Sequence, residues 1–143
     1  MTIKRTERGW AGHFICGDKC RYHRNTLLTS EDGRHIVVST VGNMVDPLRR
    51  EPMCDLGFQR HYETMAFIAG QRNTGDHYIE MLPGHDIGFS SQWAIQYTDE
   101  NKDYVDNLAD KMHDDVVEEL SENFDKRYVL AMAEYVAGHA DSE

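Results

Sequence analysis

Hydrophobic and polar positions follow two different periods along this chain, a strand-like one in its first two thirds and a helical one in its last third. Residues 10–16, 21–28 and 35–41 are strand-length segments rich in Ile, Val, Thr and aromatic side chains. The Asp-Gly pair at positions 32–33 separates the second from the third and is a hairpin signal. The pattern predicts an antiparallel meander.

Further strands are predicted up to residue 97. Residues 60–69 fit both an alternating and a helical pattern, and we favour a strand. Residues 76–82 and 87–97 are predicted to form two short strands divided by Pro83-Gly84, while the prolines of residues 43–57 predict an exposed loop. The sheet is therefore expected to contain five or six strands within residues 10–97.

The last third of the chain predicts two helices. At about 100° per residue, one arc of about 120° holds the apolar side chains Val105, Leu108, Ala109, Met112, Val116 and Leu120. Ten of the eleven acidic residues between positions 99 and 125 fall on the opposite half, with Glu119 as the exception. Continuing this register would bury Glu134, so a break is expected near residues 123–126, with a second helix over 127–137 and Gly138 as its stop.

The fold class that follows is α+β, in a single domain over residues 1–143 with its β part at 8–97 and its helices at 99–138. The second helix is apolar on nearly every side, which is typical of a helix buried on more than one face. Packing on its own sheet would satisfy it, and a homodimer contact through Tyr128, Met132 and Tyr135 is the alternative.

The net charge of −10 is unevenly distributed, with +4 on residues 1–50 and −14 on residues 51–143. The acidic part suits a partner with a basic surface and argues against a protein that binds duplex DNA directly. There is no run of 18 apolar residues and no apolar signal-peptide core at the N-terminus. We therefore expect a cytoplasmic protein that does not enter a membrane and whose cysteines are reduced.

Residues 13–23 hold the one local cluster that could bind a metal. His13, Cys16, Cys20 and His23 have an H-x2-C-x3-C-x2-H spacing, and a turn at residues 17–19 would bring the two thiols together. Each histidine is three residues from its cysteine, so regular strands would place them on opposite faces and zinc would require an irregular turn. The alternatives are a zinc site and plain buried thiols beside solvent-edge histidines; no cofactor is our expectation, with zinc as the alternative.

Evidence for catalysis is sparse. Cys54 and His61 are close in sequence, but nothing around them matches a nucleophile signature, and no glycine-rich phosphate loop is present. Whether the chain is an enzyme stays open, and we favour a non-enzyme. A small enzyme or zinc-dependent regulator would use the His/Cys cluster, with Arg60 and Glu63 as polar neighbours.

The first helix also resembles nucleic acid in its charge density. Its acids give one charge per roughly 3.7 Å of helix, similar to the phosphate spacing along one DNA strand. One face could therefore occupy a basic channel as a DNA mimic, although a solvated acidic face is equally typical of soluble proteins. The candidate contact residues are Asp103, Asp106, Asp110, Asp114 and Glu118.

Four runs of sequence support a resemblance: residues 8–16 (RGWAGHFIC), 24–28 (RNTLL), 36–42 (IVVSTVG) and 62–67 (YETMAF). Over residues 8–120 the chain resembles a group of small uncharacterised proteins of tailed bacteriophages and prophages, which has no established activity. The second helix extends beyond the shared part.

The resemblance implies a phage-encoded protein acting in the host cytoplasm. Small acidic phage proteins commonly inhibit host defence or host enzymes, so the expected function is stoichiometric inhibition of a defence or nucleic-acid-handling complex, such as a restriction or CRISPR complex. The acidic helix would contact a basic surface of that host protein. The alternatives are the zinc-binding regulator or enzyme, and an oligomeric phage accessory protein.

Overall fold

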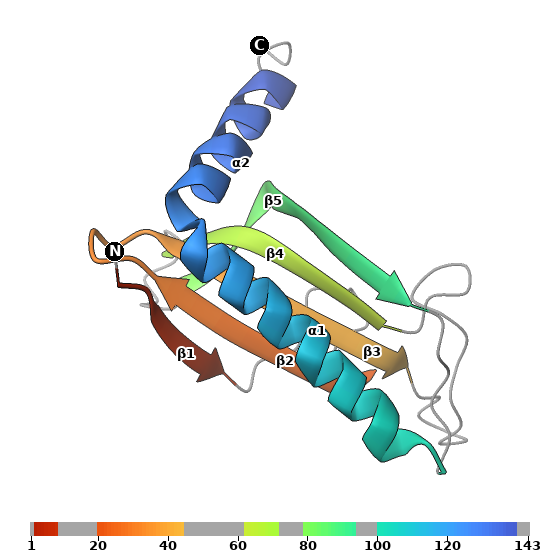
Figure 1. Cartoon of the computed structure of the whole chain (residues 1–143). Coiled ribbons are helices and arrows are strands. Elements are labelled where there is room, and N and C mark those ends of the chain that lie inside the picture. The colour runs from red at the N-terminus through yellow and green to blue at the C-terminus, as the bar shows by residue number, and fades with distance from the viewer. Residues whose placement is uncertain (1, 9–19, 45–61, 72–78, 94–99, 140–143) are drawn as a thin grey trace.

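The described residues form one antiparallel sheet and two C-terminal helices, which confirms the predicted α+β class. The computed structural model describes residues 2–8, 20–44, 62–71, 79–93 and 100–139. The sheet runs in chain order through β1 (Lys4–Arg8), β2 (Cys20–Thr29), β3 (His35–Met44), β4 (Tyr62–Gln71) and β5 (Ile79–Trp93). In Figure 1, α1 (Lys102–Glu122) lies across one face of this sheet, and α2 (Phe124–His139) turns away from the direction of α1.

The number of strands within residues 10–97 differs from the prediction. Among the described residues of that range there are four strands, not five or six, and the fifth strand of the sheet, β1, lies before it. The predicted strand at 10–16 lies outside the described residues, as does most of the predicted loop at 43–57. The predicted strand at 60–69, which fitted either pattern, is confirmed for residues 62–69 by β4, whereas residues 60 and 61 lie outside the described residues.

Pro83-Gly84 does not divide two strands, contrary to the prediction, because β5 passes through both residues. Phe67 of β4 pairs with Asp86 and Ala69 pairs with Met81, so residues 82–85 lie opposite a single residue of β4. This bulge absorbs the proline, which has no N–H to contribute to the ladder. β5 is also the last strand in the sheet order, where a missing donor is best tolerated.

The predicted hairpin between the second and third segments is confirmed. Gly33 has a φ of 84°, which a residue without Cβ adopts at little cost. The Ser30 N–H donates to the Arg34 carbonyl at 2.9 Å, and the Gly33 N–H donates to the Ser30 carbonyl at 3.1 Å. The turn fixes the register in which Leu28 pairs with Ile36.

The main core lies between the sheet and the helices. The strands contribute Leu28, Ile36, Val38, Ala66, Ile68 and Ile87, and the helices contribute Val116, Val117, Leu120, Phe124 and Ala131. Four residues of the predicted apolar stripe, Val105, Ala109, Val116 and Leu120, are buried, which confirms the inner face of α1. That face fixes which side of α1 is turned to solvent.

A smaller cluster fixes the N-terminal half of α1. Tyr62 is fully buried with Val105 and Ala109, and Tyr22 packs against them. Gly42 is the cross-strand partner of Tyr62, and a Cβ at Gly42 would lie 2.1 Å from the Tyr62 ring. Glycine is therefore required at this position because the ring lies directly over the backbone of β3.

The helices are divided at Asn123, within the predicted break. The Asn123 N–H donates to the Glu119 carbonyl, and Phe124, the first residue of α2, is buried in the core. α2 begins three residues earlier than expected and continues through Gly138 to His139. Arg34 lies over the rings of Phe124 and Tyr128 and pairs with Asp125, so the hairpin turn anchors the start of α2.

Candidate functional site

The outer side of α1 is strongly acidic, and one flank of it is joined to the sheet by ion pairs. The helix contains eight carboxylates and two lysines, a net charge of −6. Glu118 pairs with Arg5 of β1 at 2.9 Å, and Asp114 pairs with Arg24 of β2 at 3.0 Å. The predicted contact residues on this flank therefore have cationic partners within the molecule.

Arg24 is the centre of that flank, because three carboxylates share its guanidinium group. Its Nε donates to Glu7 at 2.7 Å, and its Nη1 lies 3.0 Å from Asp114 and 3.4 Å from Asp110. The Tyr22 hydroxyl also donates to Asp110. Partial burial acts to raise the pKa of Glu7, but hydrogen bonds from Arg24 and Thr26 outweigh it and leave that pKa below its usual value. Three negative charges around one positive charge leave a local excess of two negative charges.

The remaining acids of α1 differ in their exposure. Asp103 is exposed in the first turn, whereas Asp106 is half-buried. Asp115 is exposed and forms an i,i+4 pair with Lys111 at 2.7 Å. Glu119, the acid that fell on the apolar side of the predicted helix, is half-buried and pairs with Arg127 of α2. The structure therefore gives Glu119 an interhelical role and places Asp103 and Asp115 toward solvent.

Beneath α1 lies a polar group that the sequence did not single out. His113 is fully buried, and its Nε2 lies 2.7 Å from the Thr26 hydroxyl of β2. Its Nδ1 lies 2.7 Å from the Thr40 hydroxyl of β3, which in turn lies 2.7 Å from the Thr64 hydroxyl of β4. One imidazole thus joins α1 to the three central strands.

The donor and acceptor in each of these hydrogen bonds follow from the Glu7 carboxylate, which can only accept. The Thr26 hydroxyl donates to the Glu7 carboxylate at 2.7 Å, so it accepts from Nε2–H of His113. In a neutral imidazole Nδ1 is then the acceptor, so Thr40 donates to it and accepts in turn from Thr64. In this chain of hydrogen bonds from Thr64 to Glu7, each threonine hydroxyl and the imidazole N–H donates one hydrogen bond.

Burial lowers the pKa of His113 to about 4, and the nearby positive charge of Arg24 acts in the same direction. Protonation would place a hydrogen on Nδ1 and reverse the donors at Thr40 and Thr64. The buried chain therefore favours the neutral imidazole and stabilises the helix on the sheet. His113 lines neither of the two pockets formed by described residues, at Ile3 and residues 121–126 and at Thr2, Lys4 and residues 29–31.

One signal in the sequence points to His113. It lies four residues after Ala109 and three before Val116, so it belongs to the inner face at helical spacing. Threonines at alternating inward positions of the strands supply its partners. To predict that His113 bonds to these threonines, one must know which strands α1 crosses.

Only half of the predicted metal cluster lies within the described part of the chain. His13 and Cys16 lie outside it, Cys20 begins β2, and the His23 side chain is exposed on the same strand. No group of three or more His, Cys, Asp or Glu residues within residues 2–8, 20–44, 62–71, 79–93 and 100–139 could hold a metal ion. Cys54, Arg60 and His61 also lie outside these ranges, whereas Glu63 is half-buried on β4.

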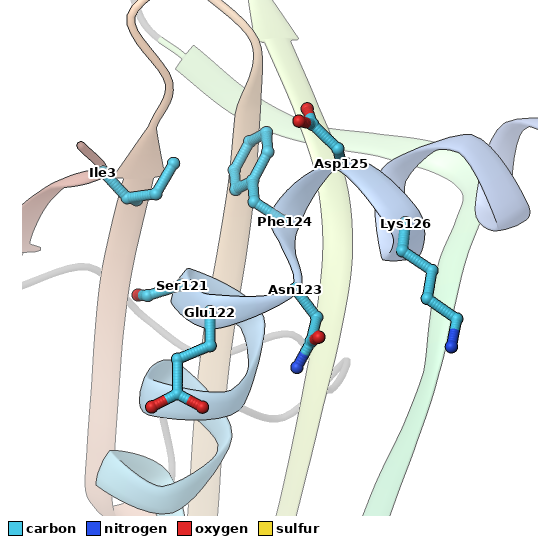
Figure 2. A pocket seen from close by; sticks show the side chains of 7 residues that line it. All are labelled: Ile3, Ser121, Glu122, Asn123, Phe124, Asp125 and Lys126. Carbon is cyan, nitrogen blue, oxygen red and sulfur yellow. The ribbon is translucent and has the colours of Figure 1, made fainter. Parts of the chain in front are cut away.

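An open groove of about 310 Å³ lies at the junction of the two helices (Figure 2). The side chains of Ile3 and Phe124 lie near each other in it, and Lys126 extends to the other side. Its other lining residues are Ser121, Glu122, Asn123 and Asp125. Asp125 is already paired with Arg34.

The chain matches no protein-family model, no curated protein and no solved structure. Neither described helix is long and apolar enough to cross a membrane.

Proposed function

We propose that this protein is a binding protein whose outer α1 face contacts a basic surface of a partner protein. The observation that carries the proposal is the arrangement of charge on that face. The apolar side of α1 packs in the core, while five of its eight carboxylates are exposed: Asp103, Asp114, Asp115, Glu118 and Glu122. A rigid helix of this kind presents a row of negative charges in fixed positions.

The ion pairs to β1 and β2 support this function. Arg5 and Glu118 are 45% and 58% exposed, so their pair contributes little to stability and stays accessible to solvent. Around Arg24 the acids outnumber the cations, and a partner's arginine or lysine would balance the excess. We therefore extend the predicted set of Asp103, Asp106, Asp110, Asp114 and Glu118 with the exposed residues Asp115 and Glu122.

The resemblance to phage proteins supplies the biological setting of the proposal. In that setting the partner is a host defence or nucleic-acid-handling protein, and the acidic helix occupies the basic channel that would otherwise hold a strand of nucleic acid. The protein then acts as a stoichiometric inhibitor in the host cytoplasm.

The test uses a fluorescein-labelled deca-arginine peptide as the basic probe and measures binding by anisotropy at low salt. Asp103→Lys, Asp115→Lys and Glu122→Lys should each weaken binding roughly threefold to tenfold, because each removes an attraction and adds a repulsion. Glu31→Lys, an equal change of charge at the exposed β2–β3 turn, is the matched control and should have little effect.

Asp110, Asp114 and Glu118 are unsuitable for this comparison, because reversing them also breaks ion pairs that join α1 to the sheet. Equal loss of binding in Glu31→Lys and in the α1 variants would show that net charge alone is responsible. That result would remove α1 as the contact. A triple α1 variant that captures the same proteins from bacterial lysate as wild type would contradict the proposal independently.

A further inference from the structure

Helix α2 has an apolar face on each of two sides, and only one of them is used in the fold. The inner side carries Phe124 and Ala131, which are buried in the main core. The outer side carries Val129 and Val136, each 61% exposed, and Leu130, 48% exposed. Ala133 and Ala137 are exposed on the same side. At about 100° per residue these five residues form one continuous stripe along the helix.

The inner face of α2 also contains the three residues that the sequence predicted as the alternative homodimer contact. Tyr128 and Met132 are partly buried against the main core, and the Tyr128 ring stacks on Phe124. Tyr135 is half-buried. A homodimer contact through these three residues is therefore less suitable than one through the outer stripe, which lies on the opposite side of the helix.

The position of α2 leaves the outer stripe accessible. In Figure 1 the C-terminal end of α2 projects beyond the sheet. The element of the sheet that α2 contacts most is β5, and α1 meets it near the break at Asn123. Among the described residues four large apolar side chains are exposed; three of them lie on this one helix, and the fourth, Tyr104, lies on α1. Such a concentration on one face is typical of a protein contact.

We infer that the outer face of α2 pairs with the same face of a second copy of this chain, in an antiparallel arrangement centred near Leu130. The charges on that face favour a second copy of the chain as the partner. Lys126, Leu130 and Glu134 are spaced four residues apart and lie on one line of the helix. A two-fold axis at Leu130 sets Lys126 of each copy opposite Glu134 of the other, so the same surface is complementary to itself.

The size of the contact predicts a weak dimer. A helix of 16 residues is about 24 Å long, so one helix pair falls below the area of a standard stable interface. Ala133 and Ala137 permit a close approach of the two helices, and the valines and Leu130 supply the apolar area. We expect a dissociation constant in the micromolar range, independent of the basic partner proposed for α1.

Sedimentation equilibrium of the full chain between about 5 and 500 μM tests the inference across the weak-interface range. Wild type should shift from monomer to dimer, and Leu130→Glu should stay monomeric. Tyr104→Glu is the matched control, since Tyr104 is 61% exposed on the other helix, and it should dimerise as wild type does. Leu130 is exposed, so its replacement should leave the thermal midpoint of dilute protein nearly unchanged.

A charge exchange tests the register. Lys126→Glu should weaken the dimer roughly tenfold, because two pairs become repulsive, and Lys126→Glu combined with Glu134→Lys should restore it. A wild type that is monomeric at all concentrations would overturn the inference, as would a dimer that survives Leu130→Glu. A double exchange that fails to restore the dimer would overturn the antiparallel register.

Discussion

The buried imidazole of His113 makes the stability of this fold depend on pH in a way that one substitution removes. In the folded chain the pKa of His113 is lowered to about 4, from an ordinary value of 6.5 that applies to the unfolded chain. As the pH falls from 6.5, the unfolded chain therefore binds the proton first. The stabilisation is complete above pH 6.5 and is lost progressively down to about pH 4.

The magnitude follows from the difference between the two pKa values. At about 1.4 kcal/mol per pH unit, His113 alone lowers the free energy of unfolding by roughly 3 kcal/mol between pH 6.5 and 4. His113→Leu removes this titration. It also removes the hydrogen bonds to Thr26 and Thr40, which should cost about 1–2 kcal/mol at pH 7.5, because each hydroxyl keeps one other partner.

The two effects have opposite signs, so the stability curves should cross. Wild type should be more stable than His113→Leu at pH 7.5, and the variant should be the more stable protein near pH 4. Urea unfolding of dilute protein at several pH values, followed by circular dichroism, measures both curves. Carboxylates common to the two proteins cancel in the difference.

His23→Leu is the control, because it removes an exposed histidine from β2 and leaves the buried chain intact. It should change stability by less than about 0.5 kcal/mol and keep the wild-type loss at acid pH. A difference between wild type and His113→Leu that stays constant from pH 7.5 to 4 would refute the reasoning, since it would mean that His113 does not resist protonation.

Two further predictions concern packing. Gly42→Ala should destabilise the protein by about 1–3 kcal/mol, because the new Cβ meets the Tyr62 ring, and adding Tyr62→Val should recover part of the loss in a double-mutant cycle; a purely additive cycle would contradict the contact. Leu120→Ala should cost about 2–5 kcal/mol in urea unfolding, because Leu120 is fully buried between α1 and the sheet, and a loss below about 1 kcal/mol would show that the helix is not docked there.

Sequence periodicity was sufficient where a structure depends on neighbouring residues. The alternation in β2 and β3 and the Asp-Gly turn between them are local, and all three are confirmed. The apolar stripe of α1 and the break at Asn123 were predicted for the same reason. The prediction that Pro83-Gly84 divides two strands was wrong, because a proline that ends a strand and a proline in an edge bulge have the same local sequence pattern.

The candidate surface was predicted only in outline. The sequence placed the acids of α1 on one side of the helix, but it could not show that Arg24 and Arg5 hold Asp114 and Glu118 against the sheet. Glu119 was the one acid predicted on the apolar half of α1, and its partner Arg127 lies on the next helix. An ion pair between separate elements depends on how those elements pack, which periodicity does not encode.

The sequence by itself determined the local structure of this protein: alternating strands, a tight hairpin, an amphipathic acidic helix and a second helix apolar on two sides. The tertiary structure alone decided how these elements meet. His113 bonds to Thr40 and Thr26, residues 73 and 87 positions away, because α1 crosses β2 and β3 at that point. The physical reason is that a buried polar group must find its partners in three dimensions, whereas periodicity along the chain states only which side of an element is turned inward.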